Sequence, residues 1–286
     1  MRPLEGFPRQ PKRFWANVRL ISQHVGYTLR NTGQIRILTL QEVARALRDM
    51  GLEPSSVVDS KGQPTPLGAS LVDYFRYRAE VLNGFVEPRL MDVNRAKELF
   101  DELYARLSPG CPIPMNKQKG EKKVPAYFTG IVNMLIEANL QGLPCEYDPR
   151  GLVVITADGA PVRTLARRVD GAFPSRINPV AIWEIKEYYF TTTFGSRVAD
   201  GVYESLLDGV ELGELLEHEG IRVLHYLMVD DYNTWWNDGR SYLCRIIDML
   251  NMGYVDEVLF GREVMDRLPA VVQEWVGILQ SRDRRP

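Results

Sequence analysis

Three triplets of the form acidic residue, any residue, lysine are the patterns in this sequence whose residue types could perform chemistry. Asp59–Lys61 lies in a predicted turn and Glu121–Lys123 in a lysine-rich segment, so both look incidental. The third, Glu184–Lys186, lies inside the apolar run 180–190, which is typical of a β-strand. Because side chains alternate between the two faces of a strand, Glu184 and Lys186 should project from the same face. Burying either charge alone is costly, so this pair needs a partner.

A second carboxylate is expected beside this pair. Asp170 lies 14 residues upstream of Glu184, in the short strand-like segment 168–173, and antiparallel pairing of the two strands would bring both residues together. Two neighbouring carboxylates repel each other, and a divalent cation relieves that repulsion. Mg²⁺ is held by one or two carboxylates together with water and a substrate phosphate, where it polarises the phosphoryl oxygen. We therefore expect Asp170 and Glu184 to bind Mg²⁺ and Lys186 to orient the attacking water; the alternative is a structural ion pair.

The elements predicted around these residues indicate an α/β fold. The order is a helix, three strands, a helix, a strand, a helix and a strand, which gives a mixed sheet with helices on both faces. We predict helices over 126–141, 196–207, 241–252 and 273–279, and strands over 152–156, 168–173, 180–190, 221–229 and 257–260.

On these residues the chain resembles the PD-(D/E)xK nuclease superfamily, which has a restriction-endonuclease-like fold with an αβββαβ core. The resemblance covers about residues 126–262, with Asp170 in the position of the first aspartate and Glu184–Lys186 as the second part of the motif. Val169 replaces the proline of the motif. The resemblance implies that Asp170 and Glu184 bind Mg²⁺, that Lys186 assists the attacking water, and that Glu137, on the first core helix, is a further metal ligand. It also implies a homodimer that cuts both strands of double-stranded DNA and leaves 5′-phosphates.

The N-terminal part of the chain differs from the rest in charge and predicted structure. Residues 1–123 contain 20 Lys and Arg against 13 Asp and Glu, whereas the remainder is acidic and the whole chain has a net charge of −2. Residues 1–107 are predicted to be mainly helical, and the capping box Thr39–Glu42 marks one helix start. A helix-turn-helix or winged-helix unit that contacts DNA and a plain helical bundle are both compatible with this pattern.

A basic linker is predicted between this region and the nuclease-like domain, 126–286. Residues 108–125 contain four prolines and two glycines, which interrupt regular structure. If the protein binds DNA, we expect phosphate contacts from the linker lysines and from Arg197, which follows the long strand near a predicted helix N-terminus. The linker lysines are Lys117, Lys119, Lys122 and Lys123.

The overall composition excludes several classes of protein. With 45% hydrophobic and 25% charged residues, the chain is typical of a globular protein rather than a disordered or coiled-coil one. No apolar run approaches the length of a membrane span, so no membrane association is expected. The three scattered cysteines favour the reducing cytoplasm, and the lack of a phosphate-binding glycine loop predicts no nucleotide cofactor.

These observations favour a Mg²⁺-dependent DNA endonuclease, with a sequence-specific type II restriction enzyme as the leading subtype. A repair, recombination or transposition nuclease of the same fold is the first alternative. A non-catalytic DNA-binding regulator is the second, and its support is the basic, helical N-terminal region.

Overall fold

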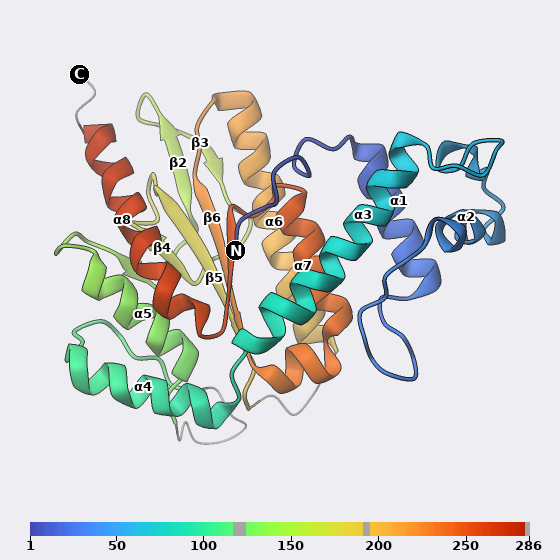
Figure 1. The fold of residues 1–286 in the computed structure, drawn as a ribbon. Coiled ribbons are helices and arrows are strands. Elements are labelled where there is room, and N and C mark those ends of the chain that lie inside the picture. The colour runs from blue at the N-terminus through green and yellow to red at the C-terminus, as the bar shows by residue number, and fades with distance from the viewer. Residues whose placement is uncertain (117–123, 191–194, 284–286) are drawn as a thin grey trace.

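A five-stranded mixed sheet forms the centre of the protein, and helices cover both of its faces (Figure 1). The computed structural model describes residues 1–116, 124–190 and 195–283. The strand order is β1-β4-β5-β6-β7, with bounds Glu146–Tyr147, Gly171–Phe173, Ala181–Glu187, Leu224–Asp230 and Glu257–Phe260. The expected α/β architecture with a mixed sheet is therefore confirmed.

The sheet changes from antiparallel to parallel pairing at its central strand, β5. β1 and β5 both run antiparallel to β4, whereas β6 and β7 run parallel to β5. The β4–β5 ladder pairs Gly171 with Trp183 and Phe173 with Ala181. The parallel β5–β6 ladder extends over seven pairs, from Ala181 with Leu224 to Glu187 with Asp230.

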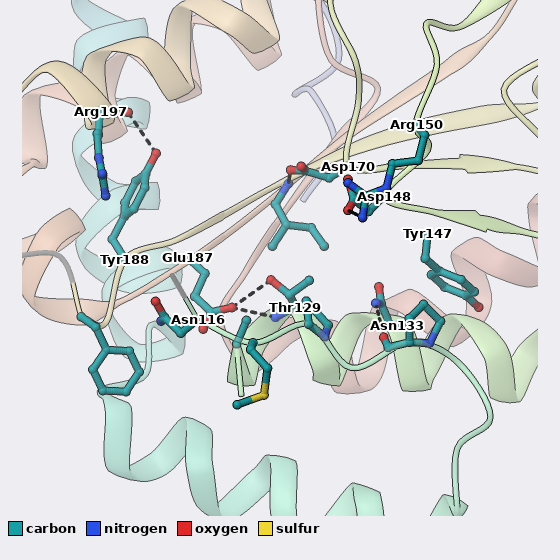
Figure 2. Close-up of a pocket in the computed structure, with 16 residues that line it drawn as sticks. Asn116, Thr129, Asn133, Tyr147, Asp148, Arg150, Asp170, Glu187, Tyr188 and Arg197 are labelled. Atoms are coloured by element: carbon teal, nitrogen blue, oxygen red, sulfur yellow. Dashed lines mark hydrogen bonds and ion pairs between the residues drawn. The ribbon is translucent and has the colours of Figure 1, made fainter. Parts of the chain in front are cut away.

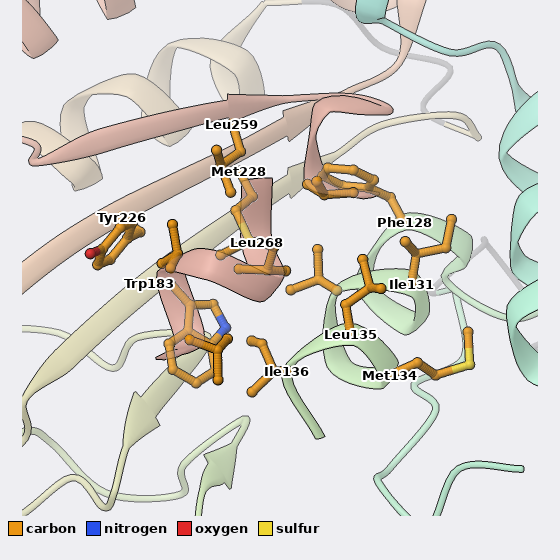
Figure 3. Close-up of a cluster of buried hydrophobic side chains, with 14 of the residues drawn as sticks. Phe128, Ile131, Met134, Leu135, Ile136, Trp183, Tyr226, Met228, Leu259 and Leu268 are labelled. Carbon is orange, nitrogen blue, oxygen red and sulfur yellow. The ribbon is translucent and has the colours of Figure 1, made fainter. Parts of the chain in front are cut away.

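One face of the sheet packs on a continuous apolar core. Trp183, Tyr226 and Met228 point into it from the strands, and α5 and α8 supply much of the opposite wall (Figure 3). Trp183 is fully buried and stacks on Trp275 of α8, with ring centroids 5.3 Å apart. The helices that share this core are α4 (Val93–Leu107), α5 (Tyr127–Asn139) and α8 (Glu263–Asp283).

A second apolar cluster covers the other face of the sheet. α6 (Ser196–Glu219) and α7 (Arg240–Asn251) pack there against side chains such as Leu227 and Val229 of β6. α6 follows β5 and leads into β6, so it forms the crossover between these two parallel strands. It comes close to β5 at Gly201, where an added Cβ would lie 2.7 Å from the hydroxyl of Tyr188 and 3.1 Å from Cδ of Lys186.

The N-terminal helices form a bundle with a core of their own. They are α1 (Lys12–Val25), α2 (Leu40–Asp49) and α3 (Pro66–Val81). The predicted capping box is confirmed, since Thr39 accepts from the backbone of Glu42 and the Glu42 side chain accepts from the backbone of Thr39. A buried ion pair, Arg78 with Asp248, joins the bundle to α7.

Three sequence predictions need correction. The predicted strand 152–156 does not enter the main sheet, because β2 (Val154–Ala157) pairs only with β3 (Ala160–Thr164) in a separate hairpin. Its predicted place beside β4 is taken by the short β1.

The last helix begins at Glu263, ten residues before its predicted start. α4, assigned from the sequence to the N-terminal region 1–107, packs against α5 in the C-terminal core.

The predicted linker 108–125 has described ends that lie side by side. The backbone N–H of Asn116 donates to Val124 O at 2.9 Å, and that of Ala126 donates to Pro114 O at 2.8 Å. Within the described part of the chain, no helix is long and apolar enough to cross a bilayer.

Candidate functional site

The pairing of β4 with β5 places Asp170 beside Glu184, as the sequence predicts. Asp170 directly precedes β4, and its backbone N–H donates to Trp183 O at 3.2 Å. Its carboxylate turns back onto β5 and accepts from the backbone N–H of Ile185 at 2.7 Å. The antiparallel register thus sets the first predicted metal ligand next to the second.

Lys186 and Glu184 lie on the face of β5 that α6 covers, and two residues from α6 join them. The Lys186 ammonium donates to Glu184 Oε2 and to Glu204 Oε2, both at 2.8 Å. Glu184 is 0% exposed and Lys186 7% exposed, whereas the Glu204 side chain is 41% exposed. This group of charges therefore extends from the protein interior to solvent through Glu204.

Arg167, which the sequence analysis missed, binds the same carboxylates. Its guanidinium donates to Glu184 Oε2 at 3.0 Å, Asp208 Oδ2 at 2.6 Å and Glu204 Oε2 at 3.3 Å. Asp208 is fully buried on α6, one helical turn beyond Glu204. We call Asp170, Glu184, Lys186, Arg167, Glu204 and Asp208 the charge cluster.

The charge cluster contains more acidic groups than basic ones, and its pKa values reflect that excess. Burial, together with the negative charge of Glu184, raises the pKa of Asp170 to about 7. Burial also raises the pKa of Asp208 to about 7, and Glu184 adds to that effect. Burial would raise the pKa of Glu184 as well, but the adjacent Lys186 and Arg167 outweigh it and the pKa is lowered.

A pocket of about 930 Å³ opens on the other side of β5, and Asp170 is its link to the charge cluster. Figure 2 shows Asp170, Asp148 and Arg150 along one wall and Glu187 with Thr129 along another. Glu184 and Lys186 do not line this pocket, because strand alternation turns them toward α6.

Glu187 is a second buried carboxyl group in the pocket wall that the sequence analysis did not single out. It accepts from the backbone N–H and the hydroxyl of Thr129, both at 2.9 Å, near the N-terminus of α5. Its other oxygen, Oε1, is buried and has no hydrogen-bond partner. Burial raises the pKa of Glu187 to about 7. The pocket wall therefore presents two carboxyl groups, Asp170 and Glu187, that titrate near neutrality.

The other predicted site residues have different positions. Glu137 does not line the pocket; its Oε2 accepts from the backbone N–H of Gly110 at 3.0 Å. Arg197 does line it, and its exposed side chain lies beside Tyr188 in Figure 2. The four linker lysines, Lys117, Lys119, Lys122 and Lys123, lie outside the described residues, although Asn116, directly before them, lines the pocket.

Asp170 and Glu184 are the two carboxylates that would have to bind a Mg²⁺ ion at this site. Glu184 Oε1 is buried without a hydrogen-bond partner, although Arg167 Nη1 lies 2.9 Å from it as an ion pair. No group of three or more Asp, Glu, His or Cys side chains within residues 1–116, 124–190 and 195–283 is arranged to hold a metal ion. Two carboxylates suit Mg²⁺ when water and phosphate complete its coordination. A cation held there would have to compete with Arg167 for Glu184.

Comparison with known proteins divides the chain at the same place as the packing does. Residues 1–85 match a model described as a domain of unknown function, DUF7690. The search of curated proteins and the search of solved structures each found no match. Residues 91–275 match a second model, described as a domain of unknown function, DUF7687, and this match includes α4 and the whole sheet. Since it covers more than half of the sequence, the chain belongs to the DUF7687 family.

Proposed function

We propose that this protein is a Mg²⁺-dependent endonuclease that hydrolyses phosphodiester bonds of double-stranded DNA. The observation that carries the proposal is the convergence of Asp170, Glu184 and Lys186 where β4 pairs with β5. The three groups come from different parts of the sequence, and a metal-dependent hydrolase needs groups of this kind together: acidic ligands and a cation near a phosphate.

The topology gives independent support for a restriction-endonuclease-like core. In that fold a helix precedes three antiparallel strands, and a second helix crosses over to a strand parallel to the third. Here the corresponding order is α5, β1, β4, β5, α6 and β6, with β1–β4–β5 antiparallel and β5–β6 parallel. The β2–β3 hairpin is an insertion in this order.

The roles of the residues follow from their positions. Asp170 and Glu184 would hold the metal, which supplies polarisation of the phosphoryl oxygen and a more acidic water. Lys186 is fixed by Glu184 and Glu204 and keeps its positive charge, since these carboxylates raise its pKa although burial opposes this. Arg150 and Arg197 border the pocket on opposite sides in Figure 2 and would contact the DNA backbone.

A non-catalytic DNA-binding protein is the second candidate, and Arg167 is the observation that favours it. Its guanidinium already neutralises Glu184, Glu204 and Asp208, which are the groups that a metal would attract. An ion-paired cluster beneath a helix can also serve only stability. In that case the chain would bind DNA in a salt-sensitive manner without cutting it.

Digestion of mapped supercoiled and linear DNA, with Mg²⁺ and with EDTA, decides between these functions. The proposal predicts Mg²⁺-dependent cutting and 5′-phosphates on the sequenced ends. Discrete sites would identify a type II restriction enzyme, and cutting at branched or damaged DNA would identify a repair or recombination nuclease. Cleavage that persists in EDTA, or salt-sensitive binding without any cleavage, would contradict the proposal.

A further inference from the structure

A second cavity lies away from β5, where the N-terminal bundle meets the C-terminal region. It has a volume of about 470 Å³, within the range of roughly 300–1,000 Å³ that is usual for small-molecule sites. Its walls come from α1, α6 and α7. The lining residues used below are Arg19, Leu20, Tyr27, Tyr203, Arg245 and Asp248.

Two arginines give this cavity a positive charge that carboxylates do not balance. Across the described part of the chain, neither Arg19 nor Arg245 forms an ion pair with an Asp or Glu side chain within 4.0 Å. The Arg19 guanidinium donates to Met252 Sδ at 3.4 Å. Asp248 also lines the cavity, but its carboxylate already accepts two hydrogen bonds from Arg78 Nη1, at 3.0 and 3.1 Å.

Aromatic rings and apolar side chains form the rest of the wall. The Arg245 guanidinium lies 5.4 Å from the centre of the Tyr27 ring and donates to the Tyr203 hydroxyl at 3.1 Å. Tyr203 is 52% exposed and Leu20 39% exposed, so both side chains present apolar surface to solvent at the cavity. A planar ring that stacked on Tyr203 would cover this exposed apolar surface.

We propose that this cavity binds a nucleotide, with its base on Tyr203 and its phosphate at Arg19. The ligand must be flat and aromatic to match the tyrosine and anionic to match two guanidinium groups that have no carboxylate partner among the described residues. A free mononucleotide and a nucleotide at the end of a DNA strand both present this chemistry. The site stands on its own residues and does not depend on the proposed cleavage reaction.

Calorimetric titration of the full chain with dAMP and with a single-stranded oligodeoxynucleotide tests this site. Deoxyadenosine and deoxyribose phosphate serve as probes that lack the phosphate and the base, respectively. We expect saturable binding of dAMP or of the oligonucleotide, and binding at least about fivefold weaker for each of the two incomplete probes. Saturation by dAMP would identify a free nucleotide as the ligand, whereas saturation by the oligonucleotide alone would identify a strand end.

Two variants and one matched control locate the binding. Tyr203→Ala and Arg19→Ala change exposed side chains, so both proteins should fold, and each should weaken binding by about fivefold or more. Tyr104→Ala removes a tyrosine of equal exposure, 51%, on α4 and should leave binding unchanged. The proposal would be overturned if neither dAMP nor the oligonucleotide binds to the wild type. It would also be overturned if the wild type and both site variants bind with equal affinity.

Discussion

Two arginines, Arg78, which is buried, and Arg167, which is partly buried, pair with carboxylates in different ways. Arg78 joins the N-terminal bundle to α7 and faces one carboxylate, Asp248, which also accepts from the Tyr74 hydroxyl at 2.6 Å. Its other Nη atom donates to Ser22 at 3.1 Å, so one cation meets one anion. Arg167 instead pairs with three carboxylates, two of which also bind Lys186, and Asp170 lies close by.

The difference teaches how to separate a structural ion pair from a site that could perform chemistry. A one-to-one buried pair is balanced in charge, so no added ion would improve it, although Arg78 Nε is buried without a hydrogen-bond partner. The charge cluster has four acidic groups against two basic ones; Asp208 Oδ1 is buried without a hydrogen-bond partner, and Glu184 Oε1 has only its ion pair with Arg167. Perturbed pKa values gather around such unbalanced groups, and they are typical of functional sites.

The largest effect on stability should come from breaking the balanced pair. Arg78→Met leaves Asp248 as an uncompensated buried charge, and we expect the free energy of unfolding to fall by about 3–5 kcal/mol. Urea denaturation followed by circular dichroism measures this. Arg76→Met, on the same helix with an exposed side chain, is the control and should change stability little. An Arg78→Met protein as stable as this control would show that the pair contributes nothing.

Breaking the unbalanced cluster should give a smaller loss that a divalent cation reverses. Arg167→Met removes a cation that is 21% exposed while Lys186 stays in place, so we expect a loss of about 1–3 kcal/mol. Mg²⁺ should restore much of this stability, because it can take the position of the lost guanidinium beside Glu184, Glu204 and Asp208. The same thermal or urea melts on Arg78→Met should show no such recovery. Equal responses of the two variants to Mg²⁺ would remove the distinction between the regions.

The last prediction concerns the pH dependence of the free energy of unfolding. The pKa of Asp208 is raised from 3.8 to about 7 by burial, so between these values the folded state holds a proton that the unfolded state has lost. Its contribution to stability is therefore full below about pH 4 and is lost as the pH rises through about 7. Asp208→Asn cannot titrate and should flatten this part of the stability profile, where one proton contributes a slope of at most about 1.4 kcal/mol per pH unit. Urea midpoints across this pH range, with Asp73→Asn as an exposed control, measure the change. A profile that keeps the slope of the wild type would contradict the expected titration.

Much of the fold and part of the site can be predicted from local sequence patterns. The alternation of β5 placed Glu184 and Lys186 on one face, and the expected antiparallel pairing brought Asp170 to them. The true first strand of the sheet, β1, has only two residues, too few for a propensity pattern, so the β-branched run 152–156 was assigned in its place.

The residues that complete the charge cluster depend on tertiary packing. Glu204 and Asp208 reach Arg167 and Lys186 because α6 crosses over β5, whereas Arg167 reaches Glu184 from the segment before β4. One signal was present in the sequence: Glu204 and Asp208 are four residues apart and therefore share a helix face. Trp235 and Trp236, which precede α7, are both buried in the apolar cluster on this face of the sheet.

The most direct test of the central claim is the rate of Mg²⁺-dependent DNA cleavage by Asp170→Asn. This variant should remain folded, because its amide oxygen can still accept from Ile185 and the repulsion from Glu184 is gone. Lys61→Ala, in the exposed Asp59–Lys61 turn, is the control. We predict cleavage at least about 100-fold slower for Asp170→Asn and unchanged for Lys61→Ala. A folded Asp170→Asn protein that cuts DNA at the rate of the wild type would contradict the account.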